Sequence, residues 1–110
     1  MTKVEEVFDL NLNQDKKVDK VIQDDNLDYI HMRFAKGEGL PIHISNSNVY
    51  MTVLQGTLTI GLNGQDPHIY HSGSLLKIPY KTQMDVRNLN DELLELIVVK
   101  APAPSTFLQK

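Results

Sequence analysis

The sequence predicts an all-β domain with two packed layers, and three features support this prediction. Short segments rich in β-branched and aliphatic residues alternate with turn-forming residues, as in β-sandwiches and barrels. The strong hairpin dipeptide Asn63–Gly64 follows a strand-like run, residues 58–62, in which aliphatic residues alternate with Thr59 and Gly61. Residues 93–99 are almost continuously apolar, which is typical of a strand covered on both faces. A single sheet cannot cover such a strand, so two layers, or a barrel with a partner subunit, are required.

The first third of the chain predicts three strands separated by polar segments. The apolar residues within 4–10 form a strand-like run, and the polar residues 11–17 form a loop. Residues 17–23 fit the pattern of one helical turn as well as that of a strand, and their β-prone composition favours the strand. Residues 24–26 then supply turn chemistry, and residues 27–34 contain enough Tyr, Ile and Phe to form the next strand.

The remaining strands are expected where short apolar segments lie between turn signals. The turns are marked by Gly37 with Gly39, Asn63–Gly64, Ser72–Gly73, Pro79 with Lys81, and residues 88–91. The segments between them read IHIS, VYMTVLQGTLTIGL, HIY, SLLKI, MDVRN and ELLELIVVK. Pro102 and Pro104 lack the amide hydrogen that a sheet ladder needs, so the tail leaves the sheet there. A meander of antiparallel strands is therefore expected.

Length and composition exclude several classes of function. A chain of 110 residues allows one domain. The absence of cysteine excludes disulfides, thiolate metal sites and a cysteine nucleophile. A net charge of -3 has the wrong sign for long-range attraction to nucleic acid or an anionic membrane. The acidic N-terminus does not resemble a signal peptide, and no apolar run approaches the ~18 residues of a membrane span, so a cytoplasmic location is expected.

Two spaced patterns carry a resemblance to a known family. They read Gly37-(x)5-His43-x-Ser45-(x)3-Val49-(x)6-Gly56 and Gly73-(x)5-Pro79-x-Lys81-(x)2-Met84-(x)3-Asn88. The spacing resembles that of the two cupin motifs, G(x)5HxH(x)3E(x)6G and G(x)5PxG(x)2H(x)3N. The positions that match are Gly37, His43, Gly56, Gly73, Pro79 and Asn88. The chain thus resembles small single-domain cupins of the conserved-barrel (cupin 2) type, with degenerate metal-binding motifs.

The resemblance implies a cupin double-stranded β-helix, which is a jelly-roll barrel of two antiparallel sheets. Cupins of this kind commonly form homodimers through their N-terminal strands, so a homodimer is expected. The single domain 1–110 then consists of N-terminal strands and a loop in 1–26, a motif-bearing barrel at about 27–101, and a tail at 102–110.

The family's four metal-binding positions correspond here to His43, Ser45, Val49 and Met84, and only His43 is a usual ligand. Catalytic metal sites usually need about three protein ligands, so we expect neither a metal nor another cofactor. Strand periodicity places Met51 on the same inward face as Val49. These five residues are the candidates for a barrel cavity, which is either a filled core or a site for a small, largely apolar ligand.

The four histidines differ in their expected roles. His43 is either a structural histidine bonded to Ser45 or to the backbone, a ligand contact, or a metal ligand. His31 is a candidate for a second imidazole in the cavity. His68 and His71 are three positions apart, an odd spacing that points them to opposite faces of a strand, and they are expected at the surface.

The function expected from these observations is small-molecule binding or an accessory role without metal. Lys81 and Tyr80, at the barrel mouth, could contact an anionic group, although an exposed turn lysine is the commoner outcome. The alternative is a cupin enzyme of the dioxygenase or isomerase type. It would use either a metal held by His43, His31 and a carboxylate, or His43 alone as acid and base. A third possibility is a structural role with a filled interior.

Overall fold

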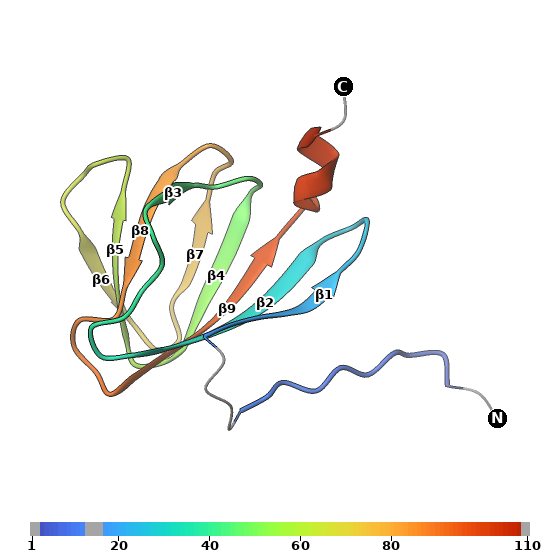
Figure 1. The fold of residues 1–110 in the computed structure, drawn as a ribbon, viewed down its shortest axis with the longest axis horizontal. Helices are drawn as coiled ribbons and strands as arrows, with labels where there is room; N and C mark the ends of the chain where they lie inside the picture. Colours follow the sequence, from blue (N-terminus) through green and yellow to red (C-terminus); the bar gives the residue numbers. More distant parts are fainter. Residues whose placement is uncertain (1–2, 13–16, 109–110) are drawn as a thin grey trace.

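The computed structural model describes residues 3–12 and 17–108 and shows two antiparallel β-sheets packed against each other (Figure 1). The strands of the described ranges are β1 (Val18–Gln23), β2 (Asp28–Ala35), β3 (His43–Ile44), β4 (Val49–Gln55), β5 (Thr57–Leu62), β6 (His68–His71), β7 (Leu75–Ile78), β8 (Gln83–Arg87) and β9 (Leu93–Lys100). One sheet has the order β1-β2-β9-β4-β7 and the other β3-β8-β5-β6. The all-β, two-layer prediction is confirmed. The expected meander is wrong, because among the described strands only β1–β2 and β5–β6 pair consecutively and the others pair through crossovers between the sheets.

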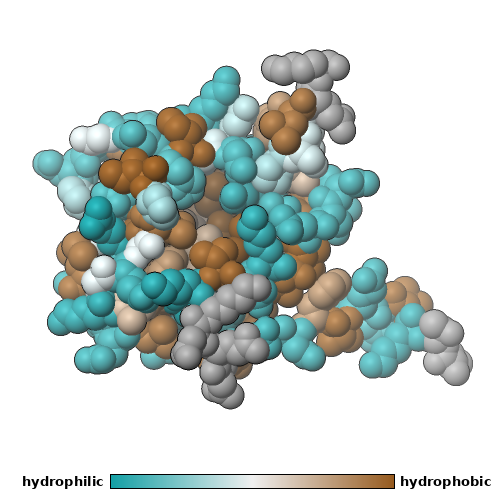
Figure 2. Space-filling view, in the orientation of Figure 1, coloured by the Kyte–Doolittle hydropathy of each residue, from teal (hydrophilic) through white to brown (hydrophobic). Residues whose placement is uncertain are grey.

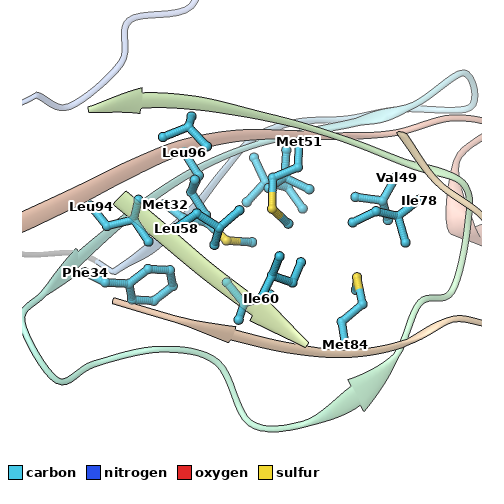
Figure 3. Close-up of a cluster of buried hydrophobic side chains, with 14 residues drawn as sticks. Met32, Phe34, Val49, Met51, Leu58, Ile60, Ile78, Met84, Leu94 and Leu96 are labelled. Carbon is cyan, nitrogen blue, oxygen red and sulfur yellow. The ribbon is translucent and has the colours of Figure 1, made fainter. Parts of the chain in front are cut away.

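The core lies between the two sheets and is built from alternate residues of the strands that line it (Figure 3). Three cross-strand pairs of β2 and β9 contribute to it: Ile30 with Val98, Met32 with Leu96, and Phe34 with Leu94. The second sheet supplies Leu58, Ile60, Met84 and Val86. Since successive strand residues point to opposite faces, this alternation is what the sequence pattern predicts.

Strand β9 is buried on both faces, as its apolar sequence predicts. It lies between β2 and β4, and its inward residues belong to the core. On the outward face, Glu95 and Ile97 are each only 8% exposed. An acidic residue buried to this degree requires partners, and Glu95 has them in His31 and Arg33.

Two turns show where the backbone demands particular residues. Asn63 and Gly64, between β5 and β6, have φ angles of 52° and 72°, which matches the positive values of a type I′ turn. Gly56 joins β4 to β5 with φ of 86°, and a Cβ atom there would lie 2.2 Å from the carbonyl oxygen of Leu93. Glycine at position 56 is thus required for two reasons, conformation and space.

The N-terminal prediction is wrong in part. Residues 18–23 of the expected segment form β1, so the sheet begins before residue 27. The strand expected within 4–10 does not form, because this segment pairs with neither sheet (Figure 1). Its later residues Phe8 and Leu10 line a groove together with residues of β1 and β2. Val4 and Val7 are exposed, and apolar residues are visible along the segment in Figure 2. Most of the predicted loop, residues 13–16, lies outside the described residues.

The C-terminal residues leave the sheet as predicted. Strand β9 ends at Lys100, and the 3₁₀ helix η1 (Pro104–Leu108) follows. The Oγ atom of Ser47 donates a hydrogen bond to the carbonyl oxygen of Pro102, which ties the tail to the loop between β3 and β4. Within the part of the chain that the structure describes, no helix has the length and apolar character needed to cross a bilayer.

Candidate functional site

The residues at the cupin motif positions come from three strands and one loop. His43 in β3 and Met84 in β8 are direct partners in the antiparallel register. Val49 begins β4, where its partner in β7 is Ile78. The spacing that carried the resemblance therefore places its first and second motifs side by side, at the end of the sheets where β3 meets β8.

The His43 side chain is half-buried and is held by the main chain. Its Nδ1 atom lies 2.8 Å from the carbonyl oxygen of Pro41, so Nδ1–H donates and Nε2 is the unprotonated nitrogen in the neutral ring. This arrangement orients the imidazole without a carboxylate partner. It matches the structural role considered from the sequence, with a backbone acceptor rather than Ser45.

Ser45 is buried and joins the β3–β4 loop to the turn between β7 and β8. Its Oγ atom donates to the carbonyl oxygen of Pro79 at 2.9 Å and accepts from the amide of Thr82 at 2.9 Å. The amide of Lys81 donates to the carbonyl oxygen of Ser45 at 3.1 Å. Because the hydroxyl proton is already used, Ser45 serves chiefly to fix these two loops.

Val49, Met51 and Met84 all lie in the hydrophobic core. Their side chains are at most 3% exposed, and they belong to the same buried cluster. In Figure 3, Val49 and Ile78 point into the interior that the sulfur-bearing end of Met84 enters. At these three positions the residues form packed core.

This donor set does not fit a metal ion. One imidazole is accompanied by a committed serine hydroxyl, a valine and the weak thioether donor of Met84. A divalent cation in a catalytic site needs about three nitrogen or carboxylate ligands from the protein. Among the described residues, no group of three or more His, Cys, Asp or Glu side chains could hold a metal.

Comparisons with known proteins connect this fold to a family. No family model matches the chain. An uncharacterised protein of Methanocaldococcus jannaschii is 33% identical over 102 residues, which is 92% of this chain and 88% of the relative. The crystal structure of an RmlC-like cupin family protein with a double-stranded β-helix fold, from the same organism, superposes with a TM-score of 0.92 at 31% identity. The match covers 98% of this chain and 100% of that one. The chain belongs to the RmlC-like cupin family.

More distant cupins share the barrel. The Cnp3 cupin domain of Schizosaccharomyces pombe has a TM-score of 0.73 at 17% identity, covering 88% of this chain and 72% of that one. A cupin 2 conserved barrel domain protein of Leptotrichia buccalis has a TM-score of 0.70 at 24% identity. The match covers 80% of this chain and 42% of that one. At these identities the likeness shows the fold alone.

His31 does not belong to the cupin interior, which corrects the expectation of a second cavity imidazole. Its neighbours Ile30 and Met32 point into the core, so His31 faces the opposite side of the sheet. There its Nε2 atom lies 2.7 Å from Oε2 of Glu95, to which Arg33 also donates at 2.8 Å. A metal site combining His31 and His43 is therefore excluded, because the two residues lie in different sheets and His31 faces outward.

Glu95 and Arg33 were missed by sequence reasoning. The signal that could have identified them is a charged residue between apolar neighbours inside a strand. Glu95 lies between leucines in LLELIVVK, and Arg33 lies between Met and Phe in DYIHMRFA. Such residues are rarely buried unless they are paired. His68 and His71 behave as predicted and are exposed on β6.

A groove lies beside the cupin motifs, at the end of the barrel near the β7–β8 turn and η1. Its volume is about 460 Å³. Its walls are formed by Ile44, Ser45, Asn46, Tyr80, Lys81, Pro104, Phe107 and Leu108. The rings of Tyr80 and Phe107 are stacked, with centroids 4.0 Å apart and an interplanar angle of 24°. Of the five cavity candidates, Ser45 lines this groove, as do Tyr80 and Lys81, which the sequence placed at the barrel mouth.

Lys81 adopts an unusual backbone conformation in this groove. Its φ angle is 68°, in the left-handed region, at the position where the cupin motif has glycine. A side chain in this region costs roughly 1–2 kcal/mol. The Nζ atom of Lys81 lies 5.4 Å from the centroid of the Tyr80 ring, within the range of a cation–π contact.

Proposed function

We propose that this cupin binds a small molecule without a metal ion and without chemical conversion, as a homodimer in the cytoplasm. The observation that carries the proposal is the packing at the motif positions. Val49 and Met84 occupy buried core sites where a cupin metal centre would need a carboxylate and an imidazole. The remaining histidine, His43, is oriented by a carbonyl oxygen rather than by an acidic residue.

These features favour binding over acid–base catalysis. A histidine that acts as general base is commonly oriented by a carboxylate, which also stabilises the imidazolium formed in the reaction. The Pro41 carbonyl oxygen carries only a partial negative charge, so its stabilisation of an imidazolium is weaker. The absence of cysteine supports the cytoplasmic part of the proposal.

Elemental analysis of protein purified without chelators tests the metal-independent function. We expect far less than one equivalent of iron, manganese, nickel or zinc per chain, both in the wild type and in His43→Ala. Stoichiometric metal in the wild type that His43→Ala removes would overturn the proposal, because it would show a working site built on His43.

The register of the degenerate site can be tested by restoring a ligand. Since His43 and Met84 are direct cross-strand partners, Met84→His brings two imidazoles to facing positions. We expect this variant to bind Ni²⁺ and Zn²⁺ more tightly than the wild type does. Metal at 100 times its Kd stabilises the folded state by about 2.7 kcal/mol, which a thermal unfolding scan detects as a higher Tm.

The matched control for this experiment combines Met84→His with His43→Ala, which leaves one imidazole. Its Tm should not respond to metal more than that of the wild type. Equal responses of Met84→His and the wild type, in a folded protein, would show that residues 43 and 84 do not face a common site.

The homodimer part of the proposal has separate support. Residues 3–12 carry exposed apolar side chains, among them Val4 and Val7, and form no strand in the described structure. On the outward face of the five-stranded sheet, Tyr29, Ile97 and Val99 are buried or half-buried. A second copy that receives the N-terminal segment would cover its exposed apolar side chains, and the half-buried Tyr29 and Val99 would add apolar contact surface on this face.

Sedimentation velocity tests the homodimer. We expect a dimer at micromolar concentration, and we expect the double variant Val4→Asp with Val7→Asp to dissociate, since its carboxylates would be buried at the interface. Ile69→Asp is the control, because Ile69 is 54% exposed on β6 in the other sheet. A monomeric wild type, or equal dimerisation of all three proteins, would contradict the proposed interface.

A further inference from the structure

The groove beside η1 has the size of a small-molecule site rather than of a protein interface. Its volume of about 460 Å³ falls within the ~300–1,000 Å³ that is usual for ligand pockets. Protein partners commonly cover about 800 Å² of surface on each side, which requires a broad face rather than a groove. The occupant that fits is a small molecule.

The groove is held in shape by bonds on both sides. Ser45 links the β3–β4 loop to Pro79 and Thr82, and Thr82 Oγ1 donates to the carbonyl oxygen of Pro79 at 2.7 Å. On the other side, Phe107 of η1 stacks on Tyr80. A site whose walls are already in place loses less entropy when a ligand binds.

The walls combine apolar surface with one positive charge. Ile44 and Leu108 are 57% and 79% exposed, which is unfavourable for aliphatic side chains unless something covers them. Pro104 and Phe107 extend this apolar surface. Lys81 is the sole charged residue among the described residues that line the groove. The chain as a whole is acidic, so this cation is a local feature.

The conformation of Lys81 is an independent observation that points to function. A glycine at this turn would avoid the strain of φ at 68°, yet lysine is present. Backbone strain that the surrounding structure maintains is concentrated at ligand and active sites. The strained turn directs a cation to the edge of an apolar groove.

We propose that this groove binds a small amphipathic carboxylate. The carboxylate group pairs with the Lys81 ammonium, and the aliphatic or aromatic body packs against Ile44, Phe107 and Leu108. The inference rests on the proposed metal-independent binding function and names the place and the class of its ligand. The site lies outside the barrel interior, which explains how a barrel with a packed interior can still bind a ligand.

Titration with octanoate, followed by ¹H–¹⁵N NMR on the full chain, tests the proposal. We expect saturable shifts confined to residues 44–46, 80–82 and 104–108. Octan-1-ol, which has the same chain without the charge, should bind at least tenfold more weakly. Shifts that do not saturate, or that lie elsewhere on the barrel, would overturn the proposal.

Lys81 variants separate the charge from the shape of the groove. Lys81→Met should weaken octanoate binding at least tenfold, whereas Lys81→Arg should remain within about threefold of the wild type. The matched control is Lys77→Met, because Lys77 also lies over a tyrosine, with Nζ 6.0 Å from the Tyr50 ring, but outside this groove. Equal affinities of the Lys81→Met and Lys77→Met variants would refute the role of the cation.

Lys81→Gly tests the strain. It should unfold at a higher temperature than Lys81→Met while binding octanoate equally weakly, since it relieves the left-handed conformation and also removes the charge. A lower Tm for Lys81→Gly would contradict the argument from strain.

The two proposals fail in different ways. No octanoate binding in a metal-free protein would refute the groove but not the metal-independent function. Stoichiometric metal on His43, together with octanoate binding that depends on Lys81, would refute the metal-independent function but not the groove.

Discussion

Gly56→Ala is expected to destabilise the protein by about 2–4 kcal/mol, a large share of the ~5–15 kcal/mol typical of a domain. A Cβ atom at this position would lie 2.2 Å from the carbonyl oxygen of Leu93 and 3.1 Å from the Cα atom of Leu94. Both are backbone atoms of β9, so they cannot move aside by changing a rotamer. Overpacking of this kind costs about 1–3 kcal/mol, and the positive φ of 86° adds roughly 1 kcal/mol.

Gly64→Ala is the matched control for that variant. Gly64 also has positive φ, 72°, but no neighbouring atom lies within 4 Å of the position that an alanine Cβ would occupy, so only the conformational cost of about 1 kcal/mol applies. Both substitutions change the entropy of the unfolded chain equally. Urea unfolding should therefore show Gly56→Ala to be less stable than Gly64→Ala by about 1–3 kcal/mol. Equal stabilities would show that β9 accommodates the extra atom.

Glu95→Ala is expected to lower the free energy of unfolding by about 3 kcal/mol. The substitution leaves His31 and Arg33 without their shared acceptor on the outward face of the five-stranded sheet. The His31 side chain is 2% exposed and that of Arg33 is 20% exposed, and both contact the same oxygen of Glu95. Water cannot replace the carboxylate at His31. Urea unfolding at neutral pH measures this loss.

The control for Glu95→Ala is Asp85→Ala, which breaks an ion pair with Arg87 in which the two side chains are 33% and 52% exposed. Exposed pairs contribute only about 0–1 kcal/mol, so this variant should remain close to the wild type. If the two variants lost stability equally, the His31–Glu95–Arg33 network would be no more important than a surface pair.

The family resemblance was readable from the sequence because glycine, proline and histidine positions recur at fixed spacing. Gly56 illustrates why such a signal is reliable, since both its conformation and the space around it admit no other residue. The pairing of His43 with Met84 in the register agrees with the alignment of the two motifs on which the expected site was built. What the spacing could not reveal is whether the interior beside His43 is open or packed.

Errors arose where one-dimensional patterns allow two answers. The residues around Val7 have strand-like composition, but a strand needs backbone hydrogen bonds to a neighbouring strand, and this segment pairs with neither sheet. His31 could face either side of β2, and the pairing of Ile30 and Met32 with core residues of β9 decides that it faces outward. The groove combines residues 44–46, 80–81 and 104–108, which are distant in sequence.

The sequence by itself determined the fold class, the turns and the residue types at the motif positions, because these depend on side-chain periodicity, backbone conformation and residue identity at single positions. The tertiary structure alone decided which surfaces are available for binding. It placed Val49 and Met84 in the core, buried the Glu95 network on the outward face, and brought Lys81 next to Phe107 through the stacking of Tyr80. Contacts between distant segments depend on how the sheets pack, and no local pattern in the chain specifies them.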